Sequence, residues 1–259
     1  MKTDSTKKTP LISCLCITKN KLQLLQRAVK CFLNQSYPNK ELIVLFEDGN
    51  DAVLEYSKSL NLKNIKFVAV PIQPKLTLGE LRNLSIQASS GEYFCQWDDD
   101  DWYHNDRLSF QFNEMIANGK QASALAYKII FNMSTSESYL SGVGPWPGTI
   151  ICQTSLIGND LSYPALSRHE DADFLDQLSV TNRLFPVIKP SLYIYIYHGN
   201  NTFGSEHFDL IFSMAQPLPA SISFAIEQII TEVTSPEDAS SFLFSHELLK
   251  ELNYMHRNA

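Results

Sequence analysis

Four consecutive carboxylates, Asp98–Asp101, are the strongest chemical signal in the sequence. They follow an apolar run, residues 92–97, that is typical of a buried strand. Adjacent carboxylates repel one another, so gathering them costs free energy unless a cation or solvent relieves the repulsion. Their hard oxygen atoms suit Mg²⁺ or Mn²⁺, which keep coordination positions open for substrate phosphates. The alternative is a solvated acidic loop or a helix start, where Asp is common in any case.

Other residues that could take part in chemistry are ambiguous when taken singly. Asp48 could accept a hydrogen bond from a base or a ribose, but Asp before Gly is also common in turns. Arg82 could hold a phosphate, although an arginine on an amphipathic helix usually faces solvent. Glu170 and Asp171 could supply a general base or only favour a helix start. His198 could bind a metal, yet a lone histidine is more often structural.

Strands and helices alternate along the first half of the chain. Apolar runs predict strands at 11–17, 41–46, 65–70 and 92–97, and helical spacing predicts helices at 22–35, 51–60 and 78–88. This alternation predicts an α/β fold with a largely parallel sheet and helices on both faces. Ligands of such sheets bind beyond the carboxyl ends of the strands. Asp48 and Asp98–Asp101 both follow strands, so we expect them in one cleft.

The second half is less regular. Strands are predicted at 122–131, 149–152 and 191–197, with a turn-rich segment at 142–148, an acidic helix start at 168–178 and helical pattern from Ser205 onward. We expect Trp146 and the loop 154–169 to shape a substrate pocket. The C-terminal helices could cap the domain, pair with another subunit or touch a membrane. Their weak basic charge disfavours membrane docking.

Composition narrows the class of protein. The 259 residues are 44% hydrophobic and 19% charged, which suits one large globular domain with or without an appendage. A net charge of -7 and the lack of a basic stripe argue against nucleic-acid binding. The five cysteines lack zinc-site spacing and predict buried free thiols in a reducing compartment. Residues 1–10 are not of signal-peptide type and no segment is of membrane-helix type, so we expect a cytoplasmic protein with at most peripheral membrane contact.

Three segments in order resemble the family 2 glycosyltransferases, which have the GT-A fold. The segments are PLISCLCITKN at 10–20, LNQSYPNKELIVLFEDGND at 33–51 and LRNLSIQASSGEYFCQWDDDDWYHNDRL at 81–108. They are similar to the family's Thr-x-Asn turn, its Tyr-Pro segment with a strand ending in Asp-Asp-Gly, and its Asp-x-Asp-Asp metal turn. The chain departs from the family at Lys19, Glu47 and Asn105, which stand where Tyr, Asp and Pro are frequent. Order and spacing make this signal more specific than an isolated acidic run.

The resemblance implies roles on the donor side of the site. Thr18 and Asp48 would line the nucleotide base, and Arg82 would lie near the diphosphate or ribose. Asp98 and Asp100 would be the ends of the Asp-x-Asp motif, with Asp100 in direct contact with Mn²⁺ or Mg²⁺ and Asp98 beside it. We place Asp99 with the donor-binding residues and expect Asp99 and Asp101 to shape the turn.

The resemblance also implies a reaction. Glu170 and Asp171 resemble the family's Glu-Asp pair, whose Asp is the general base, and HGNNT at 198–202 resembles a segment whose His approaches the metal. Inverting transfer would move a sugar from a nucleotide-sugar, most often a UDP-sugar, to a saccharide, a lipid-linked saccharide or another hydroxyl acceptor. Surface polysaccharide or glycoconjugate synthesis is the expected setting.

Under this resemblance the domain organisation is residues 1–204 as the GT-A domain, with a nucleotide-sugar half 1–110 and an acceptor half 111–204. Residues 205–259 would form a helical extension through which the chain could form a homo-oligomer. A nucleotidyltransferase is disfavoured because residues 18–21 (TKNK) lack its glycine-rich loop. The presence of Asp98, Asp100 and Asp171 argues against a catalytically inactive binding or assembly protein, an alternative that an activity measurement decides. A Ca²⁺-binding structural domain lacks its spaced acidic loop.

Overall fold

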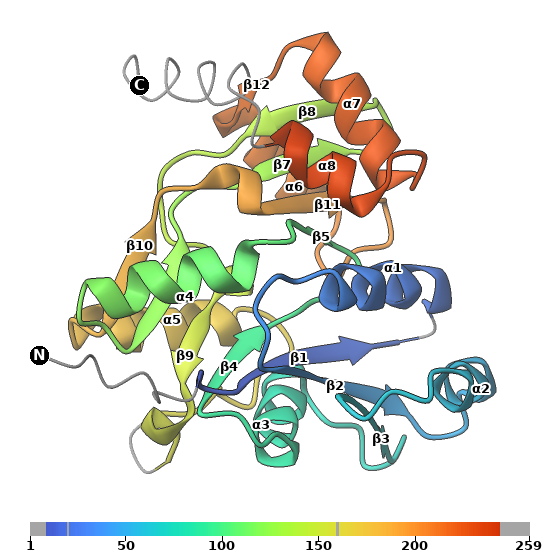
Figure 1. The fold of residues 1–259 in the computed structure, drawn as a ribbon, viewed down its shortest axis with the longest axis vertical. Coiled ribbons are helices and arrows are strands. Elements are labelled where there is room, and N and C mark those ends of the chain that lie inside the picture. Colours follow the sequence, from blue (N-terminus) through green and yellow to red (C-terminus); the bar gives the residue numbers. More distant parts are fainter. Residues whose placement is uncertain (1–8, 20, 159–160, 244–259) are drawn as a thin grey trace, which may run out of the picture.

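The protein is described here from a computed structural model that covers residues 9–19, 21–158 and 161–243. The predictions that concern residues 1–8, Asn20, residues 159–160 and residues 244–259 lie outside the described residues. Within the described part, predicted strands and helices of the first half appear where the hydrophobic pattern placed them (Figure 1).

A larger sheet of seven strands is built mainly, but not wholly, from the first half of the chain. Its order is β10-β6-β9-β4-β1-β2-β3. The strands are β1 (Ile12–Thr18), β2 (Lys40–Glu47), β3 (Ile65–Val70), β4 (Tyr93–Gln96), β6 (Ala122–Leu125), β9 (Ile151–Gln153) and β10 (Leu184–Val187). β1 to β4 run parallel, and β9 runs antiparallel to both β4 and β6. The carboxyl ends of β1, β2 and β4 therefore share one edge, as the sequence predicts.

Helices cover both faces of this sheet. They are α1 (Leu22–Leu33), α2 (Asp51–Ser59), α3 (Leu78–Ala88), α4 (Arg107–Ala117) and α5 (Glu170–Val180). Alternate strand residues point to opposite faces, so Cys14 packs in the cluster with α1 and α4, whereas Leu15 packs with α3 and α5. A capping box between Thr77 and Glu80 fixes the start of α3. All five cysteines are buried and free, which confirms the prediction of buried free thiols.

A second sheet, of order β12-β8-β7-β11-β5, lies beside the first (Figure 1). Its strands are β5 (Trp102–Tyr103), β7 (Ile129–Asn132), β8 (Glu137–Leu140), β11 (Tyr193–Tyr197) and β12 (Gln216–Pro217). The single strand predicted at 122–131 is wrong, because the chain leaves the first sheet after β6 and enters the second at β7. Both strands are buried on both faces, so one apolar run hides the break.

Short 3₁₀ helices and three C-terminal helices complete the described chain. They are η1 (Pro147–Thr149), η2 (Thr154–Leu156), η3 (Pro190–Leu192), α6 (Ser205–Met214), α7 (Ala220–Ile230) and α8 (Pro236–Leu243). Arg27 on α1 donates to the carbonyl of Ile230 at 3.4 Å and to that of Asp100 at 2.6 Å. His104 Nε2 donates to the Ser240 carbonyl at 2.9 Å. The C-terminal helices thus hold the segment around the acidic turn.

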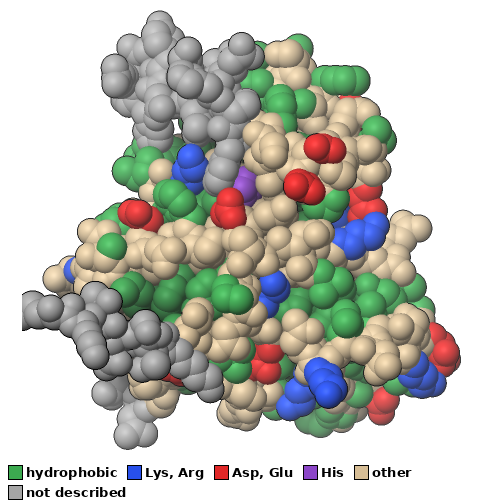
Figure 2. Space-filling model, in the orientation of Figure 1, with side chains coloured by type: hydrophobic (Ala, Val, Ile, Leu, Met, Phe, Trp, Pro, Cys, Tyr) green, Lys and Arg blue, Asp and Glu red, His purple; other side chains and the backbone are tan. Residues whose placement is uncertain are grey.

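Two surface properties bear on the expected partners. On the face drawn in Figure 2, Lys and Arg side chains are scattered among acidic and neutral ones and do not gather into a stripe. None of the helices in the described ranges is long and apolar enough to cross a membrane.

Candidate active site

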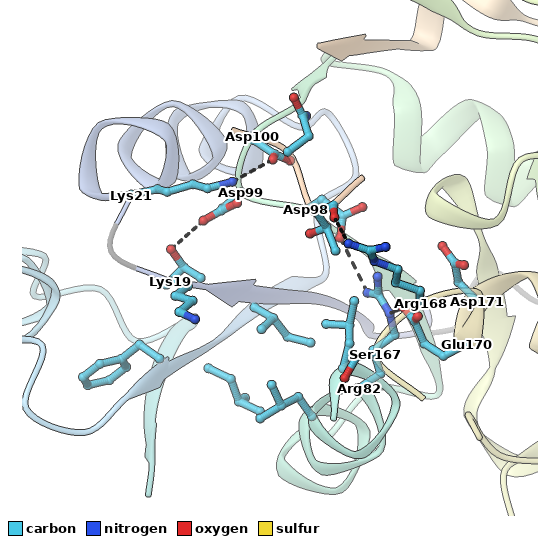
Figure 3. Close-up of a pocket in the computed structure, with 18 of the residues that line it drawn as sticks. Lys19, Lys21, Arg82, Asp98, Asp99, Asp100, Ser167, Arg168, Glu170 and Asp171 are labelled. Carbon is cyan, nitrogen blue, oxygen red and sulfur yellow. Dashed lines mark hydrogen bonds and ion pairs between the residues drawn. The ribbon is translucent and has the colours of Figure 1, made fainter. Parts of the chain in front are cut away.

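A cavity of about 460 Å³ lies beyond the carboxyl ends of β1 to β4 (Figure 3). Its lining includes most of the predicted site residues: Thr18, Arg82, Asp98, Asp99, Asp100, Glu170 and Asp171. These residues come from β1, α3, the acidic turn and α5, so the fold gathers them from segments that are far apart in the sequence. His198 and Asp48 do not line it, but His198 reaches it through Asp100.

Asp100 is the acidic-turn residue that contacts both a lysine and a histidine side chain. Its Oδ2 atom lies 3.1 Å from Lys21 Nζ and 3.1 Å from His198 Nε2. Burial alone would raise the pKa of Asp100, but the hydrogen bond from His198 and the charge of Lys21 hold it below its usual value. Asp100 is therefore an anion at neutral pH, as a metal ligand must be.

The hydrogen bonds of His198 define its tautomer. The Asn200 backbone N–H donates to Nδ1 at 3.2 Å, so in the neutral ring Nε2 carries the proton and donates to Asp100. Coordination of a metal through Nε2 would require the other tautomer and loss of the Asn200 bond. No three His, Cys, Asp or Glu side chains of the described segments form a ready-made metal cluster. A carboxylate pair with an adjacent imidazole nevertheless fits a cation that takes its other ligands from a diphosphate and water.

Arg82 joins the acidic turn to α5. Its Nε atom lies 2.9 Å from Glu170 Oε1, and its Nη1 atom lies 3.5 Å from Asp98 Oδ1. Arg82 and Glu170 are both buried, whereas 31% of the Asp98 side chain is exposed. Burial and the nearby Asp171 charge raise the pKa of Glu170 and the Arg82 guanidinium opposes them. Glu170, predicted as catalytic together with Asp171, therefore holds the arginine instead of facing the cavity with a free carboxylate.

Asp171 is a carboxylate of the cavity wall that makes few hydrogen bonds and ion pairs. It begins α5 beside Glu170, is half-buried and lines the cavity (Figure 3). Its Oδ1 atom accepts a hydrogen bond from the Ala172 backbone N–H at 2.9 Å. Among the residues that the structure describes, no cation lies within ion-pair distance of it. Asp171 can therefore accept a proton from a bound hydroxyl.

Thr18, Asp99 and Asp101 form the inner part of the turn. Thr18 Oγ1 donates to Asp99 Oδ2 at 2.6 Å. Burial and the neighbouring Asp100 charge raise the pKa of Asp99 to about 7 against this hydrogen bond. Asp101 is fully buried and accepts hydrogen bonds from the Ile196 N–H at 3.0 Å and from the Tyr193 hydroxyl. Asp101 thus fastens the turn to β11.

Asp48 does not occupy the predicted place. It is exposed, lies outside the cavity lining, and its Oδ1 atom accepts from the Gly49 N–H at 3.0 Å. Gly49 has φ of +82°, so this is the local Asp-Gly turn that competes with a ligand-binding role. Glu47 lines the cavity in its stead and lies 4.0 Å from Lys19.

Two basic residues of the cavity wall were not predicted from the sequence. Lys21 follows the first strand and binds Asp100, but a lysine before a helix has no distinctive pattern. Arg168 is exposed and donates from Nη2 to the Thr202 carbonyl at 3.3 Å. Its position in the sequence, just before Glu170 and Asp171, could have identified Arg168 as a site residue.

The chain is similar to known proteins in sequence and in fold. The profile of the family described as "Glycosyl transferase family 2" matches residues 13–170, more than half of the chain. An uncharacterized glycosyltransferase of Haemophilus influenzae is 31% identical over 111 residues, which cover 42% of this chain and 44% of that protein. The putative colanic acid biosynthesis glycosyl transferase WcaA of Escherichia coli is 34% identical over 105 residues, covering 40% of this chain and 37% of WcaA. The matched part thus spans less than half of these curated relatives.

Solved structures share the fold. S. aureus TarS 1-349 matches with a TM-score of 0.59 at 18% identity, covering 91% of this chain and 76% of that one. The mannosyltransferase PcManGT from Pyrobaculum calidifontis, solved with GDP-Man and Mn²⁺, matches with a TM-score of 0.58 at 12% identity, covering 92% and 74%. At these identities the likeness concerns the fold, which is the predicted GT-A type of α/β fold. With the profile match over residues 13–170, the chain belongs to glycosyl transferase family 2.

Proposed function

We propose that this protein transfers a sugar from a nucleotide-sugar to a hydroxyl acceptor with inversion at the sugar carbon. The observation that carries the proposal is one cavity that holds a cation-paired Asp100 and an unpaired Asp171. The names of relatives support the substrate class: TarS was solved with UDP-GlcNAc and PcManGT with GDP-Man. WcaA and AmsB are named for colanic acid and amylovoran synthesis. A UDP-sugar and surface polysaccharide or glycoconjugate synthesis are therefore our proposals for donor and setting.

The nucleotide would lie over the ends of β1 to β3. Ile17, Phe46 and Val70 give this end of the cavity apolar walls that suit a base. Lys21 and Arg82, which also line the cavity, would face the diphosphate. Asp48 could join the base only by leaving its own turn, whereas Glu47 is already in the wall.

Asp100 with Asp98 would hold Mn²⁺ or Mg²⁺, and His198 could join them after a change of tautomer. The bound ion would stabilise negative charge on the departing nucleoside diphosphate. Arg82 would assist from the protein side because Glu170 orients its guanidinium toward Asp98.

Asp171 would act as the general base. Its carboxylate takes the proton of the acceptor hydroxyl while the hydroxyl oxygen bonds to the sugar carbon and the bond to the diphosphate breaks. This single displacement inverts the sugar carbon and forms no covalent enzyme intermediate. An inactive binding protein would not need a carboxylate held without a cation partner, so we favour an enzyme over that alternative.

We further propose that residues 1–204 form the catalytic domain, with a donor half at 1–110 and an acceptor half at 111–204. Residues 205–259 would extend it, and the described helices α7 and α8 support the acidic turn through Arg27 and His104. A role in oligomerisation or membrane contact remains a separate proposal for this extension.

A thermal-shift screen of nucleotides and nucleotide-sugars tests the proposal. A ligand that binds the folded protein raises its melting temperature. We expect a uridine nucleotide with Mn²⁺ to raise Tm by several degrees, roughly the shift for 1–2 kcal/mol of linkage. The same nucleotides without Mn²⁺ should shift Tm less. No shift with any nucleotide, with or without Mn²⁺, would contradict a nucleotide-sugar site.

A further inference from the structure

Lys128 is a buried ammonium group that the proposed mechanism does not use. It lies between β6 and β7, where the chain passes from the larger sheet to the smaller one. The residue is only 5% exposed. Its Nζ atom lies 3.5 Å from the centre of the Tyr195 ring and 3.7 Å from that of Trp146. Across the described ranges, Nζ makes no hydrogen bond or ion pair with a protein group, and it is not among the side-chain nitrogen atoms that are completely closed off from solvent.

Two aromatic faces do not replace the water that such a group loses. Cation–π contacts offset part of the desolvation, but a buried cation normally has a hydrogen-bonded anion as well. Burial lowers the pKa of Lys128 to about 7, although the charges of Asp101, Asp171 and Asp98 oppose this. Trp146 beside it has a buried indole Nε1 without a partner. Within the part of the chain that the structure describes, two adjacent donor-only groups therefore have no protein acceptor atom.

The sandwich of Trp146, Lys128 and Tyr195 lies next to the reacting centre. Tyr195 lines the central cavity. Gly148, two residues after Trp146, approaches the acidic turn so closely that an added Cβ would lie 3.3 Å from Asp98 Oδ2. The sandwich is thus built on elements that meet Asp98 from the side of the second sheet.

Topology assigns this side to the acceptor. The apolar end of the cavity that suits the base belongs to β1, β2 and β3. In the larger sheet β4 separates those strands from β9, β6 and β10, and β7 and β11 belong to the second sheet (Figure 1). Lys128 therefore lies across Asp98 from the nucleotide end, on the side from which an acceptor would approach Asp171.

We propose that Lys128, with Trp146 and Tyr195, forms an acceptor subsite for a saccharide that bears a carboxylate or phosphate group. A negative group supplies the acceptor atoms that the ammonium and the indole N–H lack, and it compensates the buried charge. A neutral sugar hydroxyl would supply an acceptor atom but leave that charge uncompensated. The acceptor role rests on the proposed glycosyl transfer, whereas binding of the anion does not.

Side-chain NMR of full-length, lysine-labelled protein tests this subsite. Lys128→Arg identifies the Lys128 resonance, and the probes are glucuronate, glucose 6-phosphate and neutral glucose. We expect both anions to raise the Lys128 pKa by about one unit, which is a tenfold preference for the charged lysine, and glucose to leave it unchanged. A response to glucose 6-phosphate alone assigns the site to phosphate, and one to glucuronate alone assigns it to carboxylate. The exposed Lys58 and Lys63 serve as internal controls for non-specific ion binding.

Trp146→Phe keeps a ring face but removes the indole N–H. We expect it to weaken binding of the anions several-fold while Lys128 remains buried. Equal responses of Lys128 to the anions and glucose, or a Lys128 response no larger than those of Lys58 and Lys63, would overturn the subsite. Binding of UDP with Mn²⁺, measured on the same samples, reports separately on the proposed transferase function.

Discussion

The two sides of the acidic turn differ in whether their charged side chains form ion pairs. On the side that we propose for the donor, Arg82, Glu170 and Asp98 form a connected set of ion pairs, and Lys21 binds Asp100. On the side that we propose for the acceptor, Lys128 is buried against two aromatic rings. Among the described residues, neither Lys128 nor Asp171 has an oppositely charged group within ion-pair distance. Paired groups give a rigid cradle that holds a substrate in place. Groups without charged partners remain available for a proton or a ligand.

Asp171→Asn should produce the largest change. An amide cannot accept the acceptor's proton, so we expect transfer to fall roughly 10²–10⁴-fold while nucleotide binding persists. Product formation and UDP binding would be measured on the same preparation. Asp173→Asn, an exposed residue in the same helical turn, is the matched control. Unchanged transfer in Asp171→Asn would show that Asp171 is not the general base. The proposed difference in function between the two sides would then be wrong.

Glu170→Gln tests the side whose charges are paired. It leaves Arg82 buried without its closest carboxylate, and breaking a buried pair costs about 3 kcal/mol of unfolding free energy. Urea denaturation measures this cost. Glu55→Gln breaks an exposed pair with Lys58 and should cost about 0.5 kcal/mol or less. Equal costs in the two variants would mean that burial gives the Arg82 pair no special weight.

Lys128→Met tests the side whose charges are not paired. Because it removes a buried charge, it should stabilise the protein by roughly 2 kcal/mol at pH 6. In the folded wild type the pKa of Lys128 is lowered to about 7, from about 10.4 in the unfolded chain. The unfolded state therefore binds more protons between these values, and this group makes wild-type stability rise with pH from about 7 to 10.

The advantage of Lys128→Met should accordingly be greatest below pH 7 and fade by about pH 10. Denaturation at several pH values measures it, with the exposed Lys63→Met as control. A variant that is less stable than wild type at pH 6 would show that the aromatic sandwich compensates the ammonium fully.

Lys21→Met should have the smallest effect. The Lys21 ammonium and a divalent cation compete for the same oxygen of Asp100, so removing the lysine should tighten Mn²⁺ binding about threefold. Electron paramagnetic resonance of free Mn²⁺ measures this without a substrate. Lys19→Met is the control because Lys19 pairs with Glu47 instead. Weaker Mn²⁺ binding in Lys21→Met would show that the two cations do not compete.

Sequence patterns predicted local features well and distant pairings poorly. The bounds of β3 and α3 match the predicted ranges 65–70 and 78–88, because local signals set them: an apolar run in β3, and helical spacing with the Thr77–Glu80 capping box in α3. The pairing of Arg82 with Glu170 spans 88 residues and depends on how α3 and α5 pack, which no spacing rule gives. Lys128 lies within an apolar run that reads as one strand, so its position at a sheet crossing was hidden. For Asp48 the local pattern was the better guide, because its carboxylate accepts a hydrogen bond in its own Asp-Gly turn and does not line the predicted site.

Calorimetry of UDP binding tests the central claim most directly. Wild type and Asp100→Asn would each be titrated with UDP, with and without Mn²⁺. We predict that Mn²⁺ strengthens UDP binding to the wild type by at least about tenfold, or 1.4 kcal/mol, and that Asp100→Asn loses this dependence while it still unfolds cooperatively. UDP affinity that is the same with and without Mn²⁺, in both wild type and variant, would contradict a metal-assisted nucleotide-sugar site at Asp100.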